Sequence, residues 1–242
     1  MTGDTQVVPT TTAAPARVRL FQPTQRPTLL SGDWIETSWG RCKVTGRLGQ
    51  RHADLLECLM HYCESSRETA DGRLDLLIDP AKIRRAISDG GHSLQRIKSW
   101  MDELAAALVK IDTRDVEIVG HLIDTYRVSK QTRHNPLTGG ERNLWVVTLG
   151  DAMCELLRLD LPLYYDPAPL CRLEFGISQA VARHVLTHSK PPVGGWLLDG
   201  LITAVSGSHS GEIRNRRREL RADTERLDAV GIELKADRVY RR

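Results

Sequence analysis

The sequence lacks the features that would place the protein in a membrane or in an oxidising compartment. No apolar run approaches the roughly 20 residues that a membrane-spanning helix needs, and the chain does not open on a charged segment followed by an apolar one, as a secretion signal does. The five cysteines form no Cys-x-x-Cys pair, which favours reduced thiols over a disulfide framework. We therefore expect a cytoplasmic protein that does not associate with a membrane.

The sequence also lacks the motifs of common catalytic and cofactor-binding sites. It has no Gly-x-x-x-x-Gly-Lys-Ser/Thr loop for nucleotide phosphates, and Gly207-Ser-His-Ser-Gly211 places histidine where a nucleophile elbow has serine. His184 and His188 lie four residues apart, but no glutamate follows the first and no cysteine flanks the pair, so we expect no zinc site. The scattered carboxylates do not suggest a metal-dependent nuclease. We expect no enzyme activity, no metal and no cofactor.

One catalytic alternative stays open, a tyrosine nucleophile that nicks DNA. Its candidates are Tyr126, Tyr164, Tyr165 and Tyr240. The His-hydrophobe-His metal motif that normally activates such a tyrosine is absent from the sequence.

The most informative stretch that is present is Gly211-Glu-Ile-Arg-Asn-Arg-Arg-Arg-Glu-Leu-Arg221. It has five arginines in eleven residues, although the net charge of the whole chain is only +3. At about 100° per residue, Ile213, Leu220 and Leu227 fall on one side of a helix that runs to about Val230. The arginines gather on another side: Arg214, Arg218 and Arg221, with Arg217 at its edge. The segment therefore predicts a basic helix with one packed side and one exposed side.

A β-hairpin is expected after this helix. Gly231 ends the helix, and the residues up to Tyr240 predict two short strands about an Ala236-Asp237 turn. A basic helix followed by a hairpin is typical of a winged-helix DNA-binding domain. The alternative is a solvated helix whose arginines pair with acidic neighbours such as Glu219. We favour DNA binding because the arginines cluster in the first half of the helix, where a recognition helix enters the major groove.

The rest of the chain predicts a tail and two domains. Residues 1–33 are rich in Thr, Pro and Ala and have little periodic apolar content, so we expect a flexible, disordered N-terminal tail. Residues 34–149 and 150–242 each predict helices followed by a hairpin, with negligible identity between the halves. The expected fold class is α+β, with two tandem winged-helix domains, domain 1 at 34–149 and domain 2 at 150–242.

Both expected domains contain candidate DNA-binding residues. Pro80 suits the first position of a helix through Ile87, and Ser93 caps a longer helix to about Val109. Residues 116–128 and 142–149 predict the strands of a hairpin with a long tip. In domain 1 the candidates lie at the start of the longer helix and on the hairpin tip: Ser93, Gln95, Arg96, Lys98, Lys130 and Arg133. In domain 2 they lie on the arginine helix and the terminal hairpin: Arg214, Asn215, Arg217, Arg218, Arg221, Arg238 and Arg241.

Three segments resemble plasmid replication initiators of the TrfA type and the related IncQ RepC type. The run from Ser206 to Gly231 resembles their recognition helix, and Phe175-Gly-Ile-Ser-Gln-Ala-Val-Ala-Arg-His-Val-Leu186 resembles a helix start in the same family. Gly120-His-Leu-Ile-Asp-Thr-Tyr-Arg-Val128 resembles the strand before their inter-domain passage. The similarity covers about residues 35–242 and is strongest after about residue 115.

The resemblance implies a function. Such initiators bind directly repeated origin sites, called iterons, in double-stranded DNA, help to open the origin and recruit the host replicative helicase or its loader. Many also repress their own transcription, and their binding controls plasmid copy number. A plasmid-encoded winged-helix transcriptional repressor, or a partition-type DNA-binding protein, is the alternative, because it would use the same folds without initiating replication.

The resemblance also bears on protein partners. It implies a monomer–dimer equilibrium in which a homodimer forms through domain 1. Some members dock on the replicative sliding clamp through a Gln-Leu-Ser-Leu-Phe motif near the N-terminus. Val18-Arg-Leu-Phe21 keeps only the Leu-Phe end of that motif and lacks its glutamine, so a sliding-clamp partner is doubtful.

Overall fold

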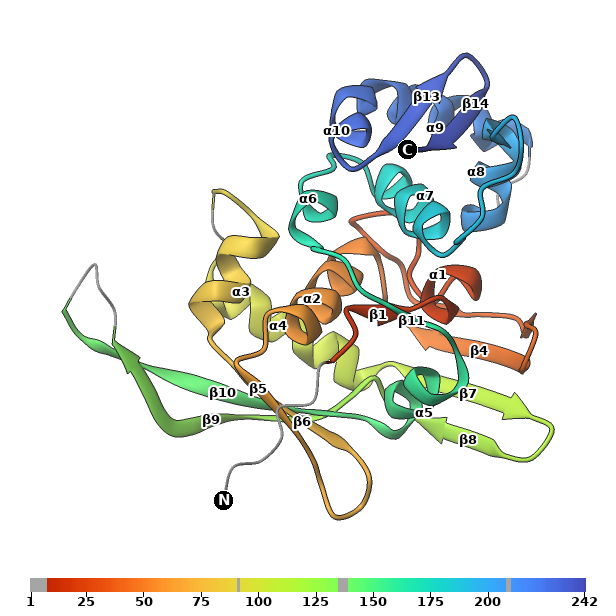
Figure 1. Cartoon of the computed structure of the whole chain (residues 1–242). Coiled ribbons are helices and arrows are strands. Elements are labelled where there is room, and N and C mark those ends of the chain that lie inside the picture. The colour runs from red at the N-terminus through yellow and green to blue at the C-terminus, as the bar shows by residue number, and fades with distance from the viewer. Residues whose placement is uncertain (1–7, 91, 135–138, 208–209) are drawn as a thin grey trace.

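The computed structural model describes residues 8–90, 92–134, 139–207 and 210–242, and it shows two domains, one above the other in Figure 1. Each domain has its own apolar core. The core of the first domain gathers side chains from its helices and from two sheets, and the core of the second extends from Leu170 to Val239. The chain therefore has the two-domain α+β architecture that the sequence predicts.

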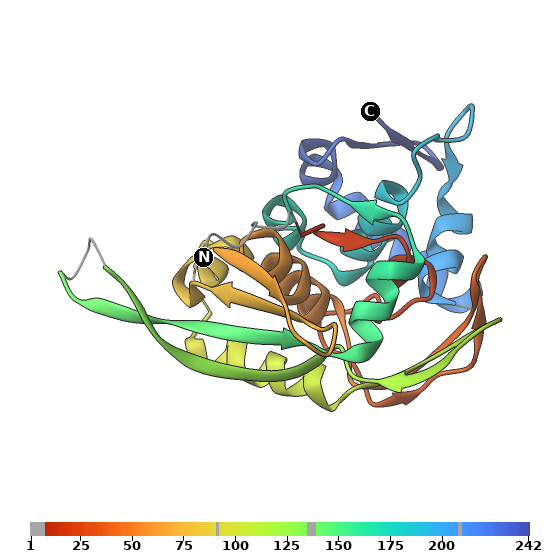
Figure 2. The same cartoon turned by 60° about the horizontal axis from the view of Figure 1, so that its bottom comes forward.

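The first domain is built on three helices and a four-stranded antiparallel sheet. The helices are α2 (Gln50–His61), α3 (Pro80–Ile87) and α4 (Leu94–Ala106), and the sheet has the order β5 (Ser65–Glu68), β6 (Leu74–Ile78), β10 (Glu141–Leu149), β9 (Ile123–His134). As the sequence predicts, Pro80 begins α3 and Ser93 caps α4, because its hydroxyl accepts a hydrogen bond from the Arg96 amide at 3.1 Å. The β9–β10 hairpin is the wing, and it projects from the body in Figure 2.

A second sheet in the first domain was not anticipated from the sequence. It contains β2 (Leu30–Ser31), β3 (Ile35–Glu36), β4 (Gly40–Gly46), β7 (Leu108–Thr113) and β8 (Glu117–Gly120). The sequence predicts a helix to about Val109, but α4 ends at Ala106 and the backbone of Ala107 is extended, with a ψ of 135°. The helical assignment after Ala106 is wrong because Val109 and Ile111, two residues apart, point into the core from a strand.

The second domain repeats the plan of the first. Its helices are α7 (Gly176–Leu186), α8 (Leu198–Ser206), α9 (Ser210–Ala222) and α10 (Thr224–Ala229), and its sheet has the order β12 (Trp196–Leu197), β14 (Arg238–Arg241), β13 (Ile232–Lys235). In both domains the last strand lies between the two earlier ones, as β6-β10-β9 and β12-β14-β13 show. The repeated winged-helix architecture is therefore confirmed, and β13 and β14 meet at the expected turn at Ala236 and Asp237.

The arginine helix is shorter than the sequence predicts. α9 ends at Ala222, and α10 begins after Asp223, whose side chain is buried. Both carboxylate oxygens of Asp223 accept backbone hydrogen bonds, from the amides of Glu174 at 3.2 Å and Phe175 at 3.0 Å. The predicted continuation to Val230 is wrong because this anchor holds Asp223 against the start of α7, where its backbone leaves the helical conformation.

The inter-domain passage contains α5 (Asp151–Leu159), β11 (Pro162–Leu163) and α6 (Ala168–Cys171). The sequence predicts that domain 2 begins at residue 150. However, Ala152, Met153 and Leu156 of α5 pack in the core of the first domain. The domain boundary therefore lies after α5 and not at residue 150 as predicted, because a single amphipathic helix buries its apolar side against the nearest core.

The N-terminal segment packs between the domains instead of forming a tail. β1 (Thr11–Thr12) pairs with β11, and α1 (Ala14–Arg17) contacts α7 and α8. The side chains of Val18, Leu20 and Phe21 are buried. Residues 1–7 of the expected tail lie outside the described residues. From Thr10 on, the expectation of a tail is wrong, because a few apolar side chains suffice to complete a core that two larger domains already supply.

Candidate nucleic-acid interface

In the second domain, α8 and α9 form the helix pair and α9 is in the place of the recognition helix. α9 packs through Leu220, which is buried, and Ile213, which is partly buried. Arg214, Asn215 and Arg218 are exposed on its other side. The division into a packed and an exposed side follows the helical spacing of the sequence.

Two of the predicted arginines are bound to neighbouring elements. Arg217 forms a two-pronged ion pair with Asp199 of α8, in which its Nε lies 2.5 Å from Oδ1 and its second nitrogen contacts Oδ2. The hydrogen bonds from Arg217 lower the pKa of Asp199. Arg221 pairs with Asp237 at the tip of the wing, at 3.2 Å. Arg217 thus fixes α9 to α8, and Arg221 fixes α9 to the wing.

Arg214 and Arg218 differ from these two arginines. Both side chains are exposed, and within the described ranges neither has a carboxylate within salt-bridge distance. Their charges are therefore available to an external anion without the loss of an internal pair. Arg214 and Arg218, together with the amide of Asn215, form the free polar side of α9.

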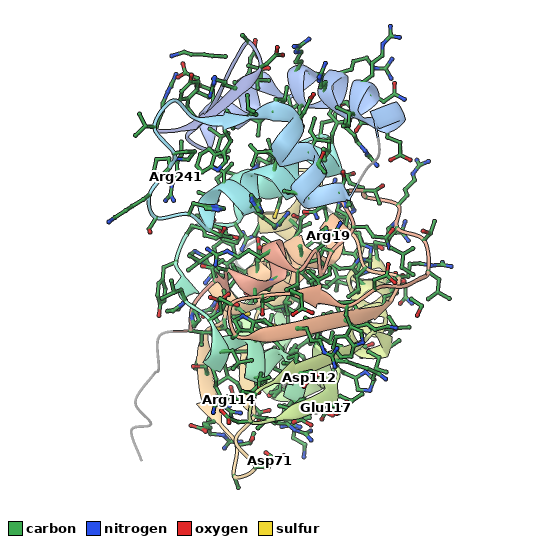
Figure 3. The ribbon with its side chains drawn as sticks, turned by 90° about the vertical axis from the view of Figure 1, so that its right-hand side faces the viewer. Arg19, Asp71, Asp112, Arg114, Glu117 and Arg241 are labelled. Carbon is green, nitrogen blue, oxygen red and sulfur yellow. The ribbon has the colours of Figure 1, made fainter. Side chains whose placement is uncertain are left out.

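The two arginines of the terminal hairpin donate to backbone carbonyls. Arg238 donates to the carbonyl of Gly194 at 2.9 Å, and Arg241 donates to that of His188 at 2.6 Å. The second bond places a cation at the C-terminal end of α7, where carbonyl groups lack helical partners. Arg241, labelled in Figure 3, therefore braces β14 against α7, whereas the sequence made it a candidate DNA contact.

The corresponding surface of the first domain lies on α3 and α4. Gln95 and Arg96 are exposed near the start of α4, and Lys98 is half-buried, with its Nζ 5.6 Å from the centre of the Trp145 ring. Ser93 is exposed as well, but its hydroxyl is engaged as the cap. The first turn of α4 therefore presents polar and cationic groups, as the sequence predicts.

Sequence reasoning missed Arg84 and Arg85 on α3. Both are exposed because Ile83 and Ile87 occupy the buried side of that helix. The helical spacing that singled out the arginines of α9 would have found them. Arg84, Lys98 and Arg142 line a cleft of about 590 Å³ between α3, α4 and β10.

The wing of the first domain contains both free and paired cations. Lys130 is exposed and has no ion pair among the residues described. Arg133 pairs with Glu64 at 2.7 Å, and Arg142 pairs with Asp79 through two bonds of 2.9 and 2.5 Å. Asp79 also caps α3 through the Ala81 amide. Arg142 thus anchors the wing to the start of α3, and Arg133 anchors it to the loop after α2. Of the predicted wing residues, only Lys130 has no such ion pair with a described residue.

Comparison with known proteins bears on the fold alone. No protein-family model matches the chain, and no curated protein matches it by sequence. A solved structure matches over 91% of this chain and 84% of its own, with a TM-score of 0.52 and 12% identity: domains 2-3 of RctB, a replication initiator of Vibrio chromosome II. The chain therefore shares the winged-helix fold of those domains. This match agrees with the tandem winged-helix arrangement that the sheet topology of the chain shows.

The segment that is similar to a sliding-clamp motif is buried in the structure. Val18 is 1%, Leu20 2% and Phe21 7% exposed. A docking peptide inserts such side chains into the pocket of its partner. These three are already inside this fold, which agrees with the doubt that the missing glutamine raises.

No group of three or more His, Cys, Asp or Glu side chains in the described ranges is placed to hold a metal ion. None of the described helices is long and apolar enough to cross a membrane.

Proposed function

We propose that the chain is a plasmid replication initiator that binds the iteron repeats of its origin. The observation that carries the proposal is the pair of winged-helix domains, each of which exposes cations on its recognition helix or beside it that form no ion pair within the described ranges. In the second domain these are Arg214 and Arg218, and in the first they are Arg84, Arg85 and Arg96. The similarity to domains of the initiator RctB supports the same assignment.

In the proposed complex, α9 and α4 enter successive major grooves of a site of roughly two helical turns. The exposed arginines, Lys98, Lys130 and the helix starts would contact phosphates, which set the register without reading the sequence. An arginine that also reaches a base would read a guanine edge through paired hydrogen bonds. The proposal assigns no catalytic role to any of these residues and needs neither a metal nor a cofactor.

The later steps of initiation belong to the proposal as well. Iteron binding would promote origin opening and bring in the host replicative helicase or its loader, and binding near the promoter of the gene would repress transcription. A homodimer that forms through the first domain would be the species that represses transcription. Among the described strands of that domain, β5 and β9 are the edges of one sheet, and β8 lies at one edge of the other with β2 and β3 at the opposite edge. An unpaired edge can add a strand from another chain.

Deleting the gene from a minimal replicon tests the proposal. We expect the plasmid to be lost, and to be maintained again when the protein is supplied from a second plasmid. If the plasmid persists and only neighbouring promoters become more active, the protein is a repressor. If segregation alone fails while copy number is unchanged, it is a partition protein.

A further inference from the structure

A buried polar network joins the two domains. Arg183 of α7 reaches α2 of the first domain, where its Nε donates to Glu57 at 2.8 Å and one terminal nitrogen donates to Asp54 at 2.7 Å. The other terminal nitrogen donates to the side-chain oxygen of Gln50 at 2.6 Å. All four side chains are buried. Every nitrogen of the guanidinium thus binds a residue of the opposite domain.

The same contact includes a second residue of α7. Gln179 donates to both carboxylate oxygens of Asp54, at 3.1 and 3.0 Å. A buried charge that loses its partner is strongly destabilising, because neither water nor another group replaces the lost bonds. Sliding or rotation of one domain on the other would break the bonds from Arg183 to Asp54 and Glu57, and Asp54 would keep only its ion pair with Arg51 of its own helix, at 3.2 Å. The network therefore favours one arrangement of the domains.

The N-terminal segment reinforces this arrangement. Thr24 lies between the starts of α2 and α7, so close that a Cβ on Gly49 would be 2.5 Å from the Thr24 carbonyl oxygen and a Cβ on Gly176 would be 2.5 Å from its Cα. Arg19 lies at the level of the domain boundary in Figure 3. Arg216 of α9 also donates to the carbonyl of Pro23, at 3.4 Å. The N-terminal segment thus contacts both domains and the recognition helix of the second.

We propose that Arg183 is a positioning residue that holds the two winged-helix domains in one fixed arrangement. Because of this lock, the chain binds two half-sites of DNA only at one spacing. The inference rests on the proposed DNA-binding function and adds a requirement on the DNA. Two rigidly linked modules bind together only if both sites lie where the modules are held. Inserting about 5 base pairs, half a helical turn, moves one half-site to the opposite face of the duplex.

The first experiment measures spacing discrimination. The probe is a duplex selected by the wild-type chain from a random pool, with and without 5 inserted base pairs between its half-sites. For the wild type we expect a loss of about 100-fold or more on the lengthened duplex, within the range of gains that linked binding gives. For Arg183→Met we expect a loss below about tenfold, with unchanged binding to an isolated half-site. A wild type that tolerates the insertion overturns the inference.

Two further variants serve as controls. Arg172→Met removes an exposed ion pair to Asp89 across the same boundary, and we expect it to discriminate spacing as the wild type does. The triple variant Asp54→Asn, Glu57→Gln and Arg183→Met leaves no buried charge unpaired, so it should fold even if Arg183→Met does not. We expect this triple variant to lose discrimination, and full retention would overturn the inference.

A measurement without DNA separates the lock from the proposed function. Spin labels are placed at Asp71→Cys, at the far end of the first domain in Figure 3, and at Lys235→Cys in the second domain, with the half-buried Cys63 replaced by Ser. We expect one narrow distance distribution in the otherwise wild-type chain and a broad one with Arg183→Met or the triple variant. Equally narrow distributions would overturn the lock. If the pool yields no DNA, the proposed function fails, and the distances alone decide whether Arg183 holds the domains.

Discussion

The affinity of the chain for DNA should depend steeply on salt, because the candidate interface presents cations that form no ion pair with another described residue. In the described part of the chain seven such residues lie on the two helix pairs and the first wing: Arg84, Arg85, Arg96, Lys98, Lys130, Arg214 and Arg218. Each phosphate that a cation neutralises contributes about −0.9 to the slope of log affinity against log salt concentration. If all seven contact phosphates, the slope is about −6, and raising the salt from about 0.1 to 0.2 M weakens binding about 80-fold.

Fluorescence anisotropy titrations of a labelled origin duplex at several salt concentrations measure this slope. Replacing Arg214 and Arg218 together by alanine should make the slope shallower by about 2 and weaken binding at every concentration. Arg158→Ala is the control, because that exposed arginine lies on α5, outside the candidate interface, and pairs with Glu155. A wild-type slope shallower than about −2 would refute the assignment of these cations to phosphates.

Three further predictions concern stability. Arg142→Ala breaks the ion pair with the buried Asp79 and should lower the free energy of unfolding by about 3 kcal/mol at pH 7. Burial raises the pKa of Asp79, but the hydrogen bonds from Arg142 and the Ala81 amide and the charges of Arg142 and Arg133 together outweigh it and lower that pKa. The difference in stability between wild type and variant, measured by urea titration, should therefore shrink as the pH falls below about 4. A difference of the same size at pH 3 would contradict an ion pair between Arg142 and an ionised Asp79. Burial lowers the pKa of His184 to about 4. The unfolded chain therefore binds a proton near pH 6.5 that the folded chain does not, so the stability of the wild type should decline as the pH falls from 6.5 to 4. Thermal melts should show a smaller decline in His184→Gln. Parallel declines in the two proteins would count against a buried, neutral His184. Gly176→Ala would press a Cβ against the Thr24 backbone and should cost about 1–3 kcal/mol. Gly200→Ala in α8, where the new Cβ would make an ordinary contact with Leu197 at 3.9 Å, should be neutral or stabilising in the same chemical denaturation; equal effects would mean that the N-terminal segment does not lie where the structure has it.

The parts of the fold that sequence predicted depend on short-range signals. Pro80 and Ser93 mark helix starts through their own backbone geometry and side chains, and the spacing of Ile213 and Leu220 shows which side of α9 packs. The repeated order of helices and hairpins was visible for the same reason. Each of these signals lies within a few residues of the element that it describes.

The parts that sequence did not predict depend on contacts between distant segments. The break of the arginine helix at Asp223 requires the amides of Glu174 and Phe175, and the burial of the N-terminal segment requires both domains to be in place. A short apolar run such as the one that forms β7 is ambiguous between helix and strand until its partner β4 is known.

The same distinction between local signals and tertiary contacts applies to the candidate interface. The exposure of Arg214 and Arg218 follows from helical spacing. The pairing of Arg217 with Asp199 and of Arg241 with the end of α7 depends on tertiary placement, so no local pattern distinguishes arginines that brace the fold from those that are free. Arg183 lies within a segment that resembles initiator sequences, yet its partners are more than 120 residues away.

The most direct test of the account is a hydroxyl-radical footprint of the wild-type chain on the DNA that flanks its own gene. We expect direct repeats of about 20 base pairs, each protected in two patches about one helical turn apart, one for each winged-helix domain. Arg214→Ala with Arg218→Ala should weaken the patch of the second domain before that of the first. A footprint that covers a single groove in each site, or no protection of any repeat, would contradict the claim that this chain reads an origin with two domains.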